Sequence, residues 1–239
     1  MKDEGIGTVK DWYNNSYKTA GFKAQRLFPN EELLRFFGRN LFSLPPEERK
    51  KVKVLETGCG SCANLWMVAH EGYDAYGLDL SDESLKLGKM RLDYWHSTAN
   101  LVCASMTDIP FEDGSMDVVI DIFSSNCLTL ADYEVFLKEV HRVLKKGGLL
   151  FIYTPTSASD AFKNHAPAQL LDKNTLNGIY RENSPFSGDH YPFRFDDLKD
   201  LDETHKRFGF ECKYKETITR TYNNMSEVFQ HVSIELMKK

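Results

Sequence analysis

The sequence predicts an α/β protein built on a doubly wound, mostly parallel seven-stranded sheet. Three observations lead to this prediction. Short apolar runs alternate with helical patterns from Val52 to about Pro155. A glycine-rich turn, "TGCGSCA", separates the first apolar run from the helical pattern that follows it. Two period-two patterns near the C-terminus flank Tyr222-Asn223-Asn224, which predicts an antiparallel strand pair.

The elements follow in order along the chain. Helices are expected over residues 1–50, where "NEELLRFFGRNLF" is amphipathic and begins at Asn30, a favourable N-cap. Strands are then expected at "KVKVLET", "DAYGLDL", "ANLVCAS", "MDVVIDIFS" and "LLFIYTP". The intervening helices are "SCANLWMVAHEG", "SDESLKLGKMRLDYW" with Ser81 as N-cap, and "LADYEVFLKEVHRVLKKGG" with Gly147 as C-cap. These elements form the parallel part of the sheet.

The last third of the chain has a different pattern. Residues 157–195 are polar, aromatic-rich and weakly periodic, and are expected to form an inserted lid over a substrate. "DDLKDLDETHKRFGF" predicts a helix closed by Gly209, ahead of the antiparallel pair. We therefore expect a single domain over residues 1–239. Its parts are a helical N-terminal cap (1–50), a core (51–156), the lid (157–195), and a C-terminal helix with antiparallel strands (196–239).

Composition limits the class of protein. A hydrophobic fraction of 41% supports a sizeable core, and a formal net charge of −5 disfavours nucleic acid as a partner. The sequence shows no signal peptide and no membrane span, and its five cysteines do not suggest a disulfide framework. We expect a cytoplasmic monomer or homodimer that acts on a small molecule.

The glycine-rich turn predicts a nucleoside-binding site. Gly58-x-Gly60-x-x-Ala63 fits the loose pattern of dinucleotide binders, and Asp79 ends the second strand, where a carboxylate could accept both ribose hydroxyls. Those features alone do not separate nicotinamide cofactors from S-adenosylmethionine. Glu56, at the end of the first strand, would repel a pyrophosphate and attract a cationic cofactor. This charge argument favours S-adenosylmethionine.

Four blocks carry a resemblance to a known family: "VLETGCGSCANL", "AYGLDLS", "CASMTDIPFEDGSMDVVIDIFSSNCL" and "EVHRVLKKGGLLFIYTP". Over about residues 50–156 the chain resembles the class I S-adenosylmethionine-dependent methyltransferases, whose fold is Rossmann-like. The resemblance implies that S-adenosylmethionine is bound and S-adenosylhomocysteine released. Ser105 stands where the family often has Asp, which weakens an expected contact with adenine. The cofactor-binding residues that the resemblance implies are Glu56, Gly58, Cys59, Gly60, Asp79, Leu80, Ser105, Met106, Asp121 and Ile122, with Trp12, Tyr13, Tyr17 and Arg26 suited to lining the cleft.

The expected reaction is methyl transfer to an O or N atom of a small polar metabolite, for example a sugar or another hydroxylated compound. His190 is the first candidate for a general base and His165 the second, because both lie in the lid. Asn126 or Tyr191 would position the acceptor. The aromatic and arginine residues of 180–195, Arg181 and Arg194 included, could also stack a base or hold an anion.

Several alternatives stay open. The chain could be an RNA- or protein-modifying methyltransferase, a non-catalytic S-adenosylmethionine-binding subunit, or an NAD-dependent dehydrogenase. Cys59 and Cys62 could form a redox pair or half a zinc site, but no second pair follows at ligand spacing, so no metal is expected. Cys103, Cys127 and Cys212 are expected to be packing residues, and His205 is expected to be solvated.

Overall fold

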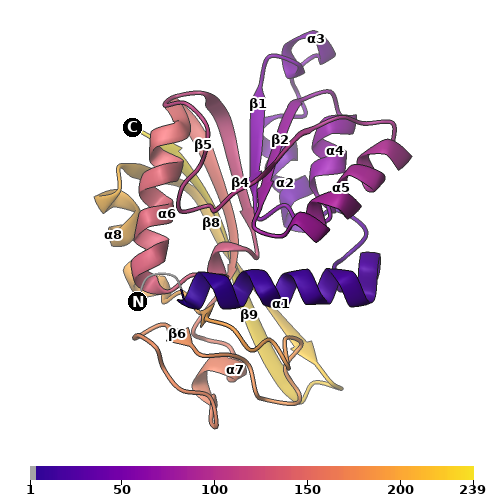
Figure 1. Ribbon diagram of the computed structural model, residues 1–239. Helices are drawn as coiled ribbons and strands as arrows, with labels where there is room; N and C mark the ends of the chain where they lie inside the picture. The colour runs from indigo at the N-terminus through magenta and orange to yellow at the C-terminus, as the bar shows by residue number, and fades with distance from the viewer. Residues whose placement is uncertain (1–3) are drawn as a thin grey trace.

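A seven-stranded sheet forms the centre of the protein (Figure 1). The computed structural model describes residues 4–239, with side chains within the first helix described from Val9 onward. The strand order is β3-β2-β1-β4-β5-β9-β8; β9 is antiparallel to both of its neighbours, and the remaining pairs are parallel. The predicted fold class is confirmed. The strands are β1 Lys53–Thr57, β2 Asp74–Asp79, β3 Asn100–Cys103, β4 Met116–Ile122, β5 Leu144–Pro155, β8 Phe210–Tyr222 and β9 Glu227–Lys238.

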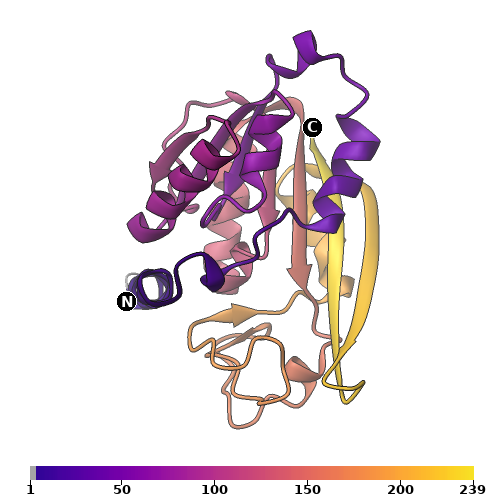
Figure 2. The ribbon, with the colours of Figure 1, turned by 90° about the vertical axis from the view of Figure 1, so that its right-hand side faces the viewer.

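Helices cover both faces of the sheet (Figure 2). One face packs against α2 (Glu31–Asn40), α4 (Leu65–His70) and α5 (Asp82–Tyr94), and the other against α6 (Leu130–Val143) and α8 (Leu198–Arg207). Consecutive residues of β1 pack on opposite faces of the sheet. Val54 lies in the core beneath α2, α4 and α5, and Leu55 lies in the core beneath α6 and α8. This is why the central strands lack polar alternation in the sequence.

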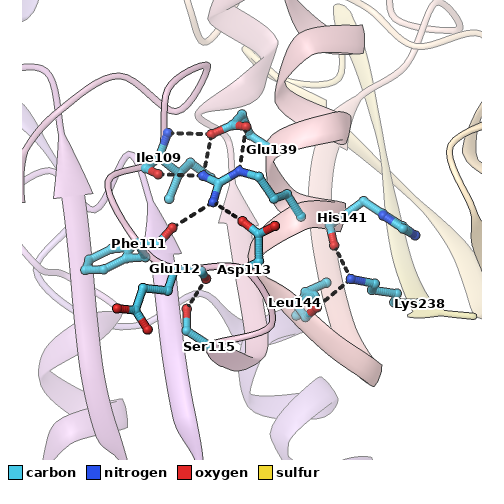
Figure 3. Close-up of polar contacts among 10 residues, drawn as sticks. Ile109, Phe111, Glu112, Asp113, Ser115, Glu139, His141, Leu144 and Lys238 are labelled. Atoms are coloured by element: carbon cyan, nitrogen blue, oxygen red, sulfur yellow. Dashed lines mark hydrogen bonds and ion pairs between the residues drawn. The ribbon is translucent and has the colours of Figure 1, made fainter.

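Two helix boundaries differ from prediction. The "SCANLWMVAHEG" helix begins only at Leu65, because residues before it form a turn in which Cys62 has a φ of +59°. Helix α6 ends at Val143, and Gly147 is not its C-cap, since β5 already begins at Leu144. The ammonium group of Lys238, on β9, donates to the backbone oxygens of His141 and Leu144 at 2.6 and 2.7 Å and so caps the end of α6 (Figure 3). A side chain distant in sequence replaces the predicted glycine.

The turn before β4 is held by one guanidinium group (Figure 3). Arg142 of α6 donates to the backbone oxygens of Ile109 and Phe111 and to the carboxylates of Asp113 and Glu139. Arg142, together with Asp113 of the turn and Glu139 of α6, therefore holds the chain in place between β3 and β4.

The N-terminal helix and the lid lie together at one end of the sheet (Figure 1). Helix α1 (Glu4–Ala20) is followed by a 3-10 turn, η1 (Gly21–Ala24), and a short helix, α3 (Pro46–Arg49), precedes β1. The lid contains α7 (Asp160–Lys163) and a two-stranded sheet of β6 (Thr175–Leu176) and β7 (Phe193–Arg194). Its apolar side chains share a third core with Val9 of α1 and Phe229 of β9. In the part of the chain that the structure describes, no helix is long and apolar enough to cross a membrane.

Candidate active site

A cavity of about 310 Å³ lies at the carboxyl ends of β1, β2 and β4, where ligands bind in doubly wound sheets. Helix α1, residues 24–26 and the lid segment 185–191 form its other walls. Its lining includes Trp12, Tyr13, Tyr17, Arg26, Gly58, Gly60, Asp79, Leu80, Ser105, Met106, Ile122 and Tyr191 from the sequence-predicted set, together with Gln25, Phe123, Ser124, Cys127, Phe186 and Asp189.

The glycine turn lines the cavity with backbone. Gly58 and Gly60 have φ values of +64° and +53°, a region that side chains rarely adopt. A Cβ at Gly58 would lie 2.3 Å from the Cβ of Ser124, and one at Gly60 would lie 2.5 Å from the hydroxyl oxygen of Tyr17. Ser124 and Tyr17 can therefore approach the backbone of the turn only because Gly58 and Gly60 have no side chains. Such a turn suits a ligand that must contact the main chain.

Asp79 offers a carboxylate to the same cavity. Its two oxygens accept hydrogen bonds of 2.8 Å from the backbone amides of Gly60 and Ser81. Burial raises its pKa, and the two amides oppose that shift. Asp79 therefore fastens the glycine turn to β2 while facing the cavity.

Three predicted cofactor residues lie behind the cavity wall. Glu56 is 1% exposed, and its carboxyl accepts a 2.7 Å hydrogen bond from the amide of Asn64. Burial raises the pKa of Glu56 to about 8, although Asn64 and Arg26 both favour the ionised form. Asp121 is buried and accepts hydrogen bonds from Ser124 and Ser125. Cys59 is buried against the sheet. Glu56, Asp121 and Cys59 support the cavity but are not among its lining residues.

The other half of the cavity is aromatic. The ring of Trp12 packs edge-on against those of Tyr13 and Tyr191, with centroids 4.9 and 5.0 Å apart. The rings of Phe123 and Phe186 stack with centroids 4.6 Å apart. The cavity thus joins a polar, glycine-lined half to an apolar half.

A series of hydrogen-bonded polar side chains crosses the aromatic half of the cavity. The hydroxyl of Tyr191 donates a 2.9 Å hydrogen bond to the carboxylate of Asp189 and lies 3.1 Å from the hydroxyl of Tyr13, which lies 3.7 Å from the sulfur of Cys127. Burial raises the pKa of Asp189 to about 6. Sequence reasoning missed Asp189. Its only signal was its place beside His190 in the lid.

The two predicted histidines lie elsewhere in the lid. His190 is exposed and stacks on Tyr180 with ring centroids 4.6 Å apart. Nδ1 of His165 lies 2.8 Å from the backbone oxygen of Phe162. Neither is among the residues that line the cavity. Their role as general bases stays a prediction, without support from this geometry.

Asn126 is buried behind the cavity wall. Neither polar atom of its side chain has a hydrogen-bond partner among the described residues. Tyr191 is the one proposed positioning residue that lines the cavity.

Several other sequence expectations need correction. Arg194 is fully buried and bonds Asp196, so it is a structural residue that is not free to hold an anion. His205 is buried, with Nε2 3.0 Å from the Tyr133 hydroxyl, and burial lowers its pKa to about 4. Cys103 and Cys212 are exposed.

Cys59 and Cys62 are both buried free thiols. Across residues 4–239 the structure has no group of three or more His, Cys, Asp or Glu side chains that could hold a metal ion.

Comparison with known proteins identifies the family. A family model described as a methyltransferase domain matches residues 55–152, which run from within β1 into β5 and hold the glycine turn and Asp79. This match of residues 55–152 to the methyltransferase-domain family supports a class I S-adenosylmethionine-dependent methyltransferase. A fatty-acid O-methyltransferase of Mycolicibacterium smegmatis is 32% identical over 135 residues, which cover 52% of this chain and 47% of the relative. The chain thus spans about half the length of that enzyme.

Two further similar proteins cover more of this chain. An uncharacterized protein of Methanocaldococcus jannaschii is 26% identical over 223 residues, covering 86% of this chain and 77% of the relative. The structure of magnesium protoporphyrin IX methyltransferase from Synechocystis PCC 6803, with bound S-adenosylhomocysteine, superposes with a TM-score of 0.67. The superposition covers 99% of this chain and 100% of the Synechocystis chain at 10% sequence identity, which shows a shared fold. S-adenosylmethionine is the cofactor that this family uses.

Proposed function

We propose that this methyltransferase transfers a methyl group to an oxygen or nitrogen atom of a small molecule held in the cavity. The observation that carries the proposal is the continuity of the cavity, which joins the glycine turn and Asp79 to an aromatic half with its own carboxylate. S-adenosylmethionine supplies an electrophilic methyl group on a sulfonium. The protein's part is to bind, orient and exclude water, since methyl transfer needs close, in-line placement of the acceptor.

The polar half of the cavity fits the cofactor. The backbone of Gly58 and Gly60 would contact its methionine portion, where neighbouring atoms leave no room for side chains. Asp79 would accept hydrogen bonds from the ribose hydroxyls, and Leu80, Ser105 and Met106 would surround the adenine. Tyr17 and Arg26 would cover it from the N-terminal side, with Glu56, Cys59, Asp121 and Ile122 supporting the floor. These assignments rest on cavity position and on the family resemblance.

The aromatic half fits the methyl acceptor. Trp12, Tyr13 and Tyr191 come from α1 and the lid, so the acceptor would be enclosed by the two segments outside the core of the sheet. Aromatic walls favour an acceptor with an apolar or planar body over a sugar, whose hydroxyls would lose their hydrogen bonds to water. In the division proposed here, the core of the sheet holds most of the cofactor, and Trp12, Tyr13 and the lid segment 185–191 enclose the acceptor.

The test is direct. Calorimetry with S-adenosylmethionine and with NADH should show binding of the first alone. Incubation with S-adenosylmethionine and a panel of small hydroxyl and amine compounds should release S-adenosylhomocysteine. Binding without methyl transfer to any compound, RNA or protein would favour a non-catalytic cofactor-binding subunit.

A further inference from the structure

Asp189 is the acidic residue of the cavity's aromatic half. Its carboxylate accepts a hydrogen bond from Tyr191, and the residue lies in the lid segment that faces α1 across the cavity. Two groups favour its ionised form: Tyr191, which donates a hydrogen bond to the carboxylate, and the nearby His190. Burial opposes both and holds the pKa near 6. A carboxylate of this kind is ionised at neutral pH and basic enough to take a proton.

The other groups of the hydrogen-bonded chain stay protonated. Burial raises the pKa of Tyr13 and Tyr191 well above the ordinary tyrosine value, and that of Cys127 to about 12. Within the chain Asp189–Tyr191–Tyr13–Cys127, Asp189 therefore carries the negative charge. Tyr191 bonds the carboxylate of Asp189, and Tyr13 continues the chain, so that the lid is linked to α1 and to η2 (Ser125–Cys127).

We propose that Asp189 is the catalytic base of this methyltransferase, and that the acceptor is a hydroxyl or ring N–H group carried by a planar aromatic molecule. The inference rests on the proposed function. The acceptor atom forms a bond to the methyl carbon as the carbon–sulfur bond breaks, and the electron pair of that bond stays on sulfur. The acceptor's proton passes to Asp189, which becomes a neutral carboxylic acid and later releases the proton to water. One positive and one negative charge cancel in the step.

The same geometry disfavours two other acceptor classes. A carboxylate acceptor needs no base, and its negative charge would meet that of Asp189 in a partly buried site, which is costly. An aliphatic sugar hydroxyl is a far weaker acid than a phenol, so a carboxylate with this pKa would remove its proton poorly. A phenol or an aromatic N–H heterocycle matches both the base and the stacked rings around it.

The acceptor class can be tested with four probes. Wild-type enzyme and S-adenosylmethionine are incubated with 2-naphthol, benzimidazole, decanoate or glucose, and released S-adenosylhomocysteine is measured. We expect 2-naphthol or benzimidazole to react at least roughly tenfold faster than decanoate and glucose. The arm that reacts tells whether the acceptor atom is oxygen or nitrogen. Faster reaction of decanoate or glucose than of both aromatic probes would overturn the acceptor class.

The base can be tested with two variants and a control. Asp189→Asn should lower kcat by roughly a hundredfold or more and remove the fall in kcat below about pH 6. Tyr191→Phe removes the hydrogen bond that favours the carboxylate, so it should move that fall to higher pH. Glu182→Gln, which neutralises an exposed acid of the same lid, should leave kcat and its pH profile unchanged.

Binding gives a readout that does not depend on turnover. The affinity of 2-naphthol for the complex with S-adenosylhomocysteine should fall below about pH 6 in the wild type and be independent of pH in Asp189→Asn. Affinity for S-adenosylmethionine should be equal in both, which also shows that the variant folds. If Asp189→Asn had the same turnover and pH profile as the wild type, Asp189 would not be the catalytic base, and the proposed function would still stand. Failure of the wild type to bind S-adenosylmethionine would overturn the proposed function itself.

Discussion

The carboxylate of Asp79 accepts a hydrogen bond of 2.8 Å from the backbone amide of Gly60. A second bond of 2.8 Å, from the amide of Ser81, occupies the other oxygen. The end of β2 is thereby fixed to the turn that follows β1. A residue predicted to bind ribose also determines the shape of the turn on which the rest of the cofactor would lie.

Replacing Asp79 by Asn should therefore weaken both cofactor binding and folding. An amide has one acceptor oxygen in place of two, so one backbone amide loses its partner. We expect the Kd for S-adenosylmethionine to rise roughly tenfold to a hundredfold, and the free energy of unfolding to fall by about 1–3 kcal/mol. Calorimetry and urea unfolding measure the two effects. Asp93→Asn, at an exposed position on α5, is the control and should change neither. Unaltered binding by the Asp79 variant would remove this residue from the proposed cofactor site.

Glu56 gives a prediction about proton release. Its pKa of about 8 means that the carboxyl is largely protonated at neutral pH. A cationic cofactor bound nearby would lower that pKa, so binding should release a proton, and affinity should rise as pH increases toward about 8. Calorimetry of S-adenosylmethionine binding in buffers of different ionisation enthalpy measures the proton.

The matched variant is Glu56→Gln, which copies the protonated carboxyl. It should bind about tenfold more weakly at a pH above 8 and release less proton than the wild type. Glu47→Gln, at an exposed position, should behave like the wild type. Equal proton release from the wild type and Glu56→Gln would place the cofactor's charge away from Glu56.

The structure also changes the reasoning that first favoured a cationic cofactor. Glu56 lies near the end of β1, as its place in the sequence predicts. The burial and the charge state of its carboxyl depend on residues from other segments. Asn64 bonds it from the turn, and Arg26, from the N-terminal segment, favours its ionised form. A raised pKa and a nearby guanidinium both reduce the repulsion that Glu56 would exert on a pyrophosphate. The family match therefore carries more weight than the charge of this one side chain.

The sheet could be predicted because its information is local. Apolar runs with glycine-containing turns locate β1, β2 and β4, and Asn30 and Ser81 cap α2 and α5 as expected. Gly58, Gly60 and Asp79 follow directly from those strand ends. The lid could not be predicted in this way. Its residues have no periodicity, and their positions are fixed by packing against α1 and β9, so the sequence did not reveal that Asp189 faces the cavity while His190 faces outward.

Arg194 illustrates the same limit and gives a stability prediction. Its guanidinium bonds Asp196 at 2.9 Å and the backbone oxygen of Ser125 at 2.5 Å, and it lies 3.7 Å from the ring centre of Tyr133. Arg194→Met leaves the buried carboxylate of Asp196 without this partner, so it should cost about 3–5 kcal/mol in urea unfolding. Arg207→Met removes an exposed ion pair with Glu134 and should cost less than about 1 kcal/mol. Similar losses in the two variants would contradict a structural role for Arg194.

His205 predicts how stability depends on pH. Burial lowers its folded-state pKa to about 4, from an ordinary value near 6.5. Between these values the unfolded chain binds a proton that the folded chain excludes. The contribution of His205 is therefore fully present above about pH 6.5 and is lost as pH falls toward 4, by up to about 1.4 kcal/mol per pH unit.

A difference measurement isolates this contribution from that of other buried groups. His231 also has a pKa lowered to about 4 by burial, whereas Asp189 has a raised pKa and acts in the opposite direction. Both the wild type and His205→Gln contain His231 and Asp189. The contributions of those two groups therefore cancel in the difference between the urea-unfolding free energies of the two proteins at each pH. The stability of the wild type should fall more steeply than that of His205→Gln between about pH 6.5 and 4. His70→Gln, at an exposed position on α4, should follow the wild type. Parallel curves for the wild type and His205→Gln would mean that His205 is protonated in the folded protein, in conflict with its burial beside Tyr133.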